Sequence, residues 1–234
     1  MTFTIIGVCK RTKKVGYCQS TSTPAVGFRC ADVVPGHGVF TFQASSDFRL
    51  KELTARLMNF GYSPAKVLKE LKDTDAHFER RQIAIVGLDG VAVAHTGNLN
   101  LDWKGHEVGD GFVACGNALS GPPVVAAIGE SFRKHANEDL EERLLRAIEA
   151  GRDAGGQPDG QVSAAMIVYG EHPFPLVNLR VDVSAEPIGE LRKIFDWYRP
   201  LIPFYVQRTL DPSSVGRYKA FLADKGLAIN PYKH

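Results

Sequence analysis

The residue best suited to chemistry is Thr2, which directly follows Met1. Removal of a methionine is sterically easy before a small hydroxyl residue. The new N-terminal threonine combines a nucleophilic hydroxyl with an α-amine whose reference pKa is about 7.7–8.0, suited to accepting a proton near neutral pH. The alternative is that Thr2 only opens the segment Thr2–Cys9, a β-type run of branched and aromatic residues. The sequence therefore indicates a candidate nucleophile at the start of an expected core strand.

A second candidate catalytic group is Asn117, which follows Cys115-Gly116 at the expected end of a strand. Attack on a carbonyl needs a hydrogen-bond donor at the point where the oxyanion forms, and an asparagine amide can supply it. The preceding glycine lets the backbone approach closely. Capping of a turn is an equally open role for Asn117.

Further polar residues are candidates for substrate binding above the first strand. They are Thr21, Gln43, Arg81 with its neighbour Gln82, Arg180 and Asp182. Arg180 and Asp182 are two positions apart on an expected strand, so their side chains share a face. For this pair, a structural ion pair is the favoured alternative.

Neither a metal nor a cofactor is expected. Asp102, Trp103, His95 and His106 invite a metal or acid–base interpretation, but their spacing is not that of metal ligands. We expect His95 to be a buried histidine with satisfied hydrogen bonds and Asp102-Trp103 to anchor a loop. The glycine-rich segments lack the lysine and helix context of a phosphate-binding loop.

Composition and charge exclude several classes of protein. The chain has 234 residues, enough for one large domain or for one domain with a substantial appendage, and its 28 basic and 26 acidic residues give a net charge of +2. Without a basic stripe interleaved with aromatic residues, a dedicated nucleic-acid binder is not expected. We also expect no leader segment and no membrane span, because no apolar run approaches about 18 residues.

The four cysteines are scattered along the chain and form no CxxC pair. They are Cys9, Cys18, Cys30 and Cys115. This pattern indicates reduced, buried thiols in a cytoplasmic protein.

The hydrophobic pattern predicts grouped rather than alternating strands and helices. The expected strands are residues 2–9, 15–20, 39–44, 82–87, 91–96, 111–115, 163–169 and 176–183. Two helices are expected between residues 50 and 75, two between 122 and 154, and a helical tail from residue 188. Grouping excludes a doubly wound fold and predicts an α+β sandwich of two stacked antiparallel sheets with a helix pair on each outer side. The strand Thr2–Cys9 should be central, with Ile5, Ile6 and Val8 buried.

An ordered set of short motifs carries a family resemblance over residues 2–183. The motifs include Thr2-Phe3-Thr4-Ile5, Val15-Gly16, Ala25-Val26-Gly27, Gln43-Ala44, Arg81-Gln82, Thr96-Gly97, Asp102-Trp103, Gly105-His106, Gly116-Asn117, Ala154-Gly155-Gly156, Ser163-Ala164-Ala165 and Leu179-Arg180-Val181-Asp182. With them the chain resembles the N-terminal nucleophile (Ntn) hydrolases, and more closely the bacterial family called domain of unknown function 1028. The resemblance implies a four-layer αββα fold and hydrolysis of a small amide or related C–N bond by Thr2 after Met1 removal. The alternative is a non-catalytic protein that binds a small molecule on the same scaffold and keeps Met1.

The chain departs from the family pattern at four places. Phe42 stands where the family usually has threonine, and Asp47 where it has asparagine. Gln157-Pro158 replaces an Asp-Arg pair, and Val162 replaces a glutamine. The departures change polar groups that could line a site.

The C-terminal tail lies outside the matched segment. We expect residues 1–185 to form the Ntn-like domain, and residues 186–234 a helical extension packed on that domain or on a partner subunit. The tail is rich in large apolar residues, namely Phe195, Trp197, Tyr198, Leu201, Phe204 and Tyr205. Such density predicts a homodimer contact, with packing against the chain's own helices as the alternative.

Overall fold

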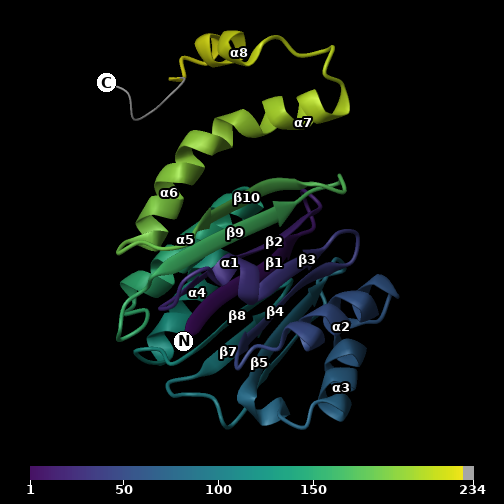
Figure 1. Cartoon of the computed structure of the whole chain (residues 1–234), viewed down its shortest axis with the longest axis vertical. Coiled ribbons are helices and arrows are strands. Elements are labelled where there is room, and N and C mark those ends of the chain that lie inside the picture. The colour runs from purple at the N-terminus through teal and green to yellow at the C-terminus, as the bar shows by residue number, and fades with distance from the viewer. Residues whose placement is uncertain (229–234) are drawn as a thin grey trace. The chain divides into compact units, whose positions relative to one another are not determined.

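The computed structural model describes residues 1–228, and its strands form two antiparallel sheets (Figure 1). The strands are β1 (Thr2–Cys9), β2 (Lys14–Thr21), β3 (Ala31–Val34), β4 (Gly38–Ala44), β5 (Arg81–Gly87), β6 (Ala92–Thr96), β7 (Gly105–Gly109), β8 (Phe112–Asn117), β9 (Ser163–Tyr169) and β10 (Pro175–Val181). One sheet has the order β10-β9-β2-β1-β8-β7 and the other the order β3-β4-β5-β6.

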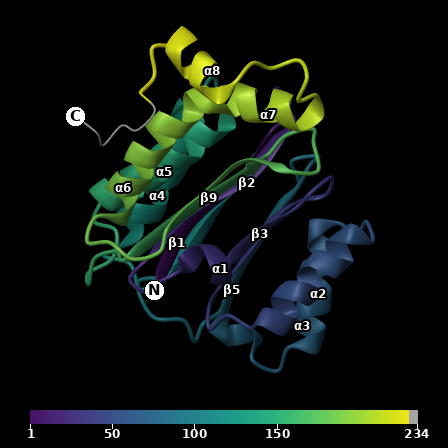
Figure 2. The same cartoon turned by 45° about the horizontal axis from the view of Figure 1, so that its top comes forward.

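Helices cover the outer face of each sheet. The helices are α1 (Val26–Arg29), α2 (Phe48–Asn59), α3 (Pro64–Thr74), the 3₁₀ turn η1 (Phe78–Arg80), α4 (Pro122–Lys134), α5 (Leu140–Asp153), α6 (Pro187–Tyr198), the 3₁₀ turn η2 (Arg199–Leu201), α7 (Ile202–Leu210) and α8 (Tyr218–Asp224). The pair α4 and α5 packs on the six-stranded sheet, and α2 and α3 pack on the four-stranded sheet (Figure 2). The predicted α+β sandwich with four layers, αββα, is confirmed.

Strand β1 occupies the centre of the six-stranded sheet, between β2 and β8. All eight of its residues are buried, and Ile5 and Ile6 have no exposed surface. Alternate β1 side chains face the second sheet or the helix pair, so burial on both faces favours a largely apolar run whose few polar groups are hydrogen-bonded. The predicted central position of this strand is confirmed.

Alternation along the strands separates the core into layers. Ile6, Tyr17 and Val113 belong to an apolar cluster between the two sheets. Phe40 and Ile83 belong to a second cluster beneath α2 and α3. Neighbouring residues of one strand therefore lie in different environments. This alternation determines which polar side chains of the candidate site meet.

Two short strands were missing from the predicted order. Strand β7 has the sequence Gly-His-Glu-Val-Gly, with a single strongly β-forming residue, and it lies at a sheet edge. Strand β3 has only four residues and contains Asp32. Both depend on pairing with a neighbouring strand, β8 and β4, rather than on their own propensity.

The chain divides after Leu191 into two compact units. In the second unit, Phe204 is 2 % exposed, and its ring lies 4.8 Å from that of Phe221 and 5.7 Å from that of Tyr218. The stacked rings of Tyr198 and Tyr205 lie 5.9 Å apart. Part of the aromatic set of the tail thus packs within the tail itself. Within residues 1–228, no helix is long and apolar enough to cross a membrane.

Candidate active site

Strand pairing places three of the predicted site residues together. Thr2 lies opposite Thr21 on β2 and opposite Asn117 on β8, and residues directly opposite each other share a face of the sheet. Thr4, two residues after Thr2, donates a hydrogen bond from Oγ1 to Oε1 of Gln43 on the other sheet, over 2.8 Å. The shared face is therefore the one that lies between the two sheets.

The hydroxyl of Thr2 is enclosed by the N-terminal peptide. Thr2 Oγ1 donates to the Met1 carbonyl oxygen over 2.7 Å and lies 3.1 Å from Thr21 Oγ1. The Thr21 hydroxyl also donates to the Met1 carbonyl. Thr2 is 4 % exposed, whereas Met1 is 36 % exposed. With Met1 in place, its peptide group caps the hydroxyl from the solvent side.

A buried thiol and a cation border this hydroxyl. Burial raises the pKa of the Cys30 thiol, although the nearby Arg29 and a hydrogen bond with Thr2 act in the opposite direction. The pKa of the Met1 α-amine is lowered, chiefly by burial and further by Arg29, while Cys30 opposes this shift. The surroundings of Thr2 thus favour a neutral thiol and a neutral amine.

A network of amide side chains lies between the two sheets, next to Thr2 and Thr4. Gln82 has no exposed surface, and its Oε1 accepts from Gln43 Nε2 over 2.7 Å and from Asn117 Nδ2 over 3.0 Å. Its Nε2 lies within 3.0 Å of three acceptors, Thr96 Oγ1 and the carbonyl oxygens of Gly105 and Gly116. Gln82 therefore links β4, β6 and β8 and fixes the orientation of the Asn117 amide.

Replacement of Gln82 by leucine is expected to reduce the free energy of unfolding by about 2–4 kcal/mol, because it leaves buried amide donors and carbonyls without partners. Urea unfolding at pH 7 measures this change. The exposed Gln207→Leu serves as the matched control and should change stability by less than about 0.5 kcal/mol. A Gln82→Leu protein as stable as the wild type would contradict a structural role for this network.

Asn117 lies beside Thr2 on the neighbouring strand β8, and its amide is anchored by Gln82. It is 2 % exposed, and an amide has two N–H groups, of which one engages Gln82. The close approach of β8 to Thr2 and to Leu119 depends on Gly116. A Cβ at this position would lie 2.6 Å from Leu119 Cδ1 and 3.1 Å from the Thr2 carbonyl oxygen.

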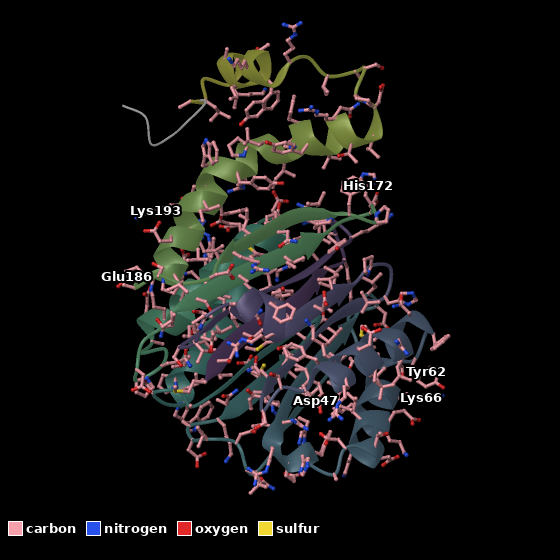
Figure 3. All side chains as sticks on the ribbon, viewed as in Figure 1. Asp47, Tyr62, Lys66, His172, Glu186 and Lys193 are labelled. Atoms are coloured by element: carbon pink, nitrogen blue, oxygen red, sulfur yellow. The ribbon has the colours of Figure 1, made fainter. Side chains whose placement is uncertain are left out.

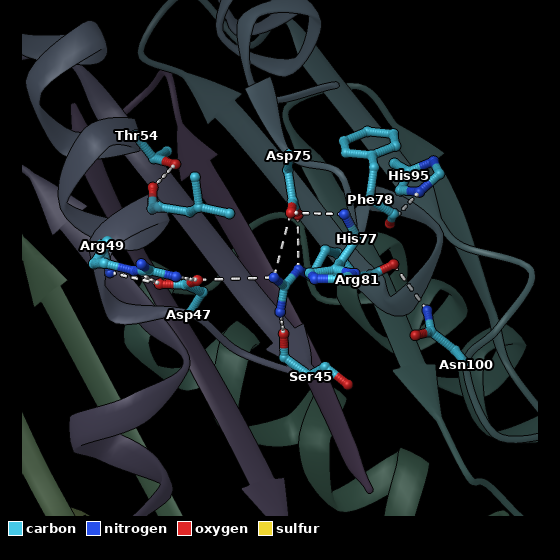
Figure 4. Close-up of polar contacts among 11 residues, drawn as sticks. Ser45, Asp47, Arg49, Thr54, Asp75, His77, Phe78, Arg81, His95 and Asn100 are labelled. Atoms are coloured by element: carbon cyan, nitrogen blue, oxygen red, sulfur yellow. Dashed lines mark hydrogen bonds and ion pairs between the residues drawn. The ribbon is translucent and has the colours of Figure 1, made fainter. Parts of the chain in front are cut away.

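Arg81 does not join Thr2, although Gln82 beside it faces the site. Arg81 points to the outer side of the four-stranded sheet, where Nε donates to Asp75 Oδ2 over 2.8 Å and Nη1 donates to the Ser45 carbonyl (Figure 4). Asp47 Oδ2 lies 3.8 Å away from Nη2 of Arg81. The side chains of Arg81 and Asp75 are 8 % and 6 % exposed, so this is a buried ion pair.

Arg180 and Asp182 form an ion pair with each other at the edge strand β10. Arg180 Nη2 lies 2.7 Å from Asp182 Oδ2, and the two side chains are 42 % and 49 % exposed. The backbone carbonyl of Asp182 accepts from Ala25 N over 3.0 Å, which holds the chain entering α1. The structure thus places this pair beside α1 and bonds it internally.

Two of the departures from the family pattern lie on the outer side with Arg81. Phe42 belongs to the core cluster beneath α2 and α3, and Asp47 caps α2 by accepting from Arg49 N over 2.9 Å. Figure 3 labels Asp47 in this layer, with Tyr62 and Lys66. These two departures therefore do not change the polar groups around Thr2.

The histidines are engaged in local contacts. His95 Nε2 lies 3.2 Å from the Phe78 carbonyl oxygen, and its ring stacks on Phe78 at 3.9 Å. His106 Nδ1 lies 2.8 Å from Thr96 Oγ1. In the described part of the chain, no group of three or more His, Cys, Asp or Glu side chains could hold a metal ion. All four cysteines are free and buried.

A cavity of about 600 Å³ opens at the other end of β1 from Thr2. Its lining includes Lys13 and Val15 of the β1–β2 hairpin and His172 of the β9–β10 hairpin (Figure 3). Lys13 and Glu171 of its lining form an exposed ion pair at 3.4 Å. This cavity is separate from the polar groups around Thr2.

Together, two stacked antiparallel sheets between helix layers form a four-layer αββα sandwich, and a hydroxyl residue opens its central strand. The chain belongs to the family of unknown function DUF1028, which it matches over residues 2–191. It is similar to the crystal structure of protein SPO2555 from Silicibacter pomeroyi, a DUF1028 protein, with a TM-score of 0.78 and 26% sequence identity over 98% of this chain and 99% of that one.

More distant likenesses are to two other solved structures. Eukaryotic HslV from Trypanosoma brucei gives a TM-score of 0.45 and 14% identity over 73% of this chain and 99% of that one. Anbu, the ancestral beta-subunit from Yersinia bercovieri, gives a TM-score of 0.42 and 9% identity over 88% of this chain and 97% of that one. A comparison with curated proteins gave no match.

Proposed function

We propose that this protein is an amide hydrolase whose nucleophile is the Thr2 hydroxyl after removal of Met1. The observation that carries the proposal is the position of Thr2 Oγ1, on the face between the sheets and 3.1 Å from Thr21 Oγ1, with Asn117 on the other flanking strand. Thr21 would orient the hydroxyl, and the second N–H of the Asn117 amide would stabilise the oxyanion. The near-complete burial of Thr2 favours a small amide or a related C–N compound as substrate.

In the proposed reaction, the α-amine of Thr2 accepts the hydroxyl proton while Oγ1 forms a bond to the substrate carbonyl carbon. The resulting ammonium donates this proton to the substrate nitrogen as the C–N bond breaks and the amine leaves. Water then attacks the ester, gives a proton to the α-amine, and the proton returns to Thr2 Oγ1 as the C–O bond breaks. The net reaction converts an amide and water into a carboxylic acid and an amine.

The surroundings of the N-terminus support the α-amine as the base. Burial is the largest cause that lowers the pKa of the Met1 amine below 8.0, and Arg29 adds to it. An amine at Thr2 would lie one residue further into the same surroundings. A lowered pKa increases the fraction of the amine that is neutral, and therefore able to accept a proton, near pH 7.

The experiment that tests this proposal first is the intact mass of the protein purified from its native cell. Hydrolysis by Thr2 requires the loss of one methionine residue, because an acylated nitrogen cannot accept the proton. If the native protein keeps Met1, Thr2 is not the nucleophile.

A second candidate function is non-catalytic binding of a small molecule by the unprocessed chain. One observation favours it, namely that the Met1 carbonyl accepts hydrogen bonds from both Thr2 and Thr21. The unprocessed N-terminus therefore has a defined place on β1. Retention of Met1 in the native protein would support this function.

The role that we propose for the tail is self-association of the protein. A homodimer formed through the aromatic residues that the tail leaves accessible, such as Tyr205 at 38 % exposure, remains a prediction from the sequence.

A further inference from the structure

A basic residue that the sequence patterns did not single out lies beside Thr2. Arg29 ends α1, the helix next to the chain's N-terminus in both views (Figures 1 and 2). Its neighbour Cys30 is buried, and Thr2 acts to lower the pKa of the Cys30 thiol. Arg29 Nη2 donates to Thr23 Oγ1 over 2.5 Å, and Thr23 follows Thr21 by two residues. The guanidinium is thus held at the rim of the proposed site.

Part of this guanidinium is buried without a hydrogen-bond partner. The Nε–H of Arg29 is inaccessible to solvent and makes no hydrogen bond within the chain, and the same holds for the hydroxyl of Ser22. A buried donor without an acceptor is costly, and most such donors in native proteins are paired. The unpaired donor of Arg29 indicates that the guanidinium keeps hydrogen-bonding capacity for an acceptor from outside the chain.

The charge of Arg29 is not neutralised by a nearby carboxylate. The nearest acidic residue in sequence, Asp32, lies 3.5 Å from Lys51 Nζ and is paired with it. Among residues 1–228, no carboxylate oxygen lies within ion-pair distance of Arg29. By contrast, Arg49 and Arg81 are each bonded to aspartate. Of these three arginines, Arg29 alone lies near Thr2 and has its charge available.

We propose that Arg29 binds a carboxylate group of the substrate, so that the protein acts on amides whose acyl part carries a second, anionic group. The planar guanidinium offers parallel N–H donors that match a carboxylate. Binding of the carboxylate at Arg29 would then hold the amide carbonyl over Thr2. The substrate class rests on the proposed function, whereas carboxylate binding by Arg29 stands without it.

The test uses probes of matched shape. The mono-p-nitroanilides of malonic, succinic and glutaric acid are compared with their methyl esters, in which the anionic group is blocked. Calorimetric titration of the Met1-free Thr2→Ala protein measures binding without turnover. The best of the three acids should bind about 10- to 100-fold more tightly than its ester, as expected for charge-assisted hydrogen bonds.

Variants separate Arg29 from general charge effects. Arg29→Gln in the Thr2→Ala background should bind acid and ester equally, and Arg29→Lys should keep part of the preference. Arg49→Gln, which removes an arginine whose side chain is 90% exposed, should leave the preference intact. Unchanged thermal melting of the Arg29 variants shows that loss of binding is not loss of the fold.

The outcomes are distinguishable from those of the proposed function. Equal binding of acid and ester by the Thr2→Ala protein, or an acid preference that survives Arg29→Gln, would overturn the Arg29 proposal. Selective binding of the acid with no release of p-nitroaniline by the Met1-free wild-type protein would leave the Arg29 site standing and would count against amide hydrolysis.

Discussion

Replacement of Thr2 by alanine is expected to reduce amide hydrolysis by the Met1-free protein by a factor on the order of 10³ or more. Alanine also permits removal of Met1 and keeps the α-amine, so the change removes only the attacking oxygen and its methyl group. Release of p-nitroaniline from the mono-p-nitroanilides measures the rate. The substitution removes one hydroxyl group, with its contact to Thr21, and one methyl group. The free energy of unfolding should therefore change by no more than about 1–2 kcal/mol.

Two control variants sharpen this result. Thr2→Ser keeps the hydroxyl and the amine and should retain much of the rate. Thr74→Ala removes a hydroxyl at the end of α3 that bonds only the Glu70 carbonyl, and it should have no effect on the rate. Hydrolysis that persists in Thr2→Ala, with the N-terminus verified by mass, would rule out Thr2 as the nucleophile.

The sequence predicted the central strand and the layer order because these depend on patterns that the chain carries locally. A run such as Thr2–Cys9, buried at every position, fits only a sheet covered on both faces. Strands β3 and β7 were not predicted, since short edge segments form through pairing with a neighbour rather than through their own composition.

Part of the candidate site could be predicted from the sequence because it depends on the pairing of neighbouring strands. Thr2, Thr21 and Asn117 meet because of strand register, which follows once three antiparallel strands are placed side by side. Period-two alternation shows that Arg81 and Gln82 point in opposite directions, but it does not show which of them faces the other sheet. Arg29 gave no signal, because a four-residue helix is too short to show periodicity.

Replacement of Arg81 by methionine is expected to reduce the free energy of unfolding at pH 7 by about 3–5 kcal/mol, since it leaves Asp75 charged and buried without its partner. Urea unfolding measures the change. The control variant Arg49→Met removes the partner of Asp47, an arginine whose side chain is 90% exposed. It should reduce the free energy of unfolding by less than about 1 kcal/mol. The double variant Arg81→Met, Asp75→Leu should recover most of the loss, because it buries no charge.

The loss caused by Arg81→Met should depend on pH. Burial alone would raise the pKa of Asp75, but hydrogen bonds and the charge of Arg81 hold it below its ordinary value. A depressed folded-state pKa stabilises the protein above the unfolded value of about 3.9, and this contribution is lost as the pH falls through the folded-state pKa. Without Arg81, burial raises the pKa of Asp75, so acidification neutralises the carboxylate and relieves the variant. The stability difference between wild type and variant should therefore be smaller at pH 4 than at pH 7, and an equal difference at both pH values would show that the charge of Asp75 does not cause it.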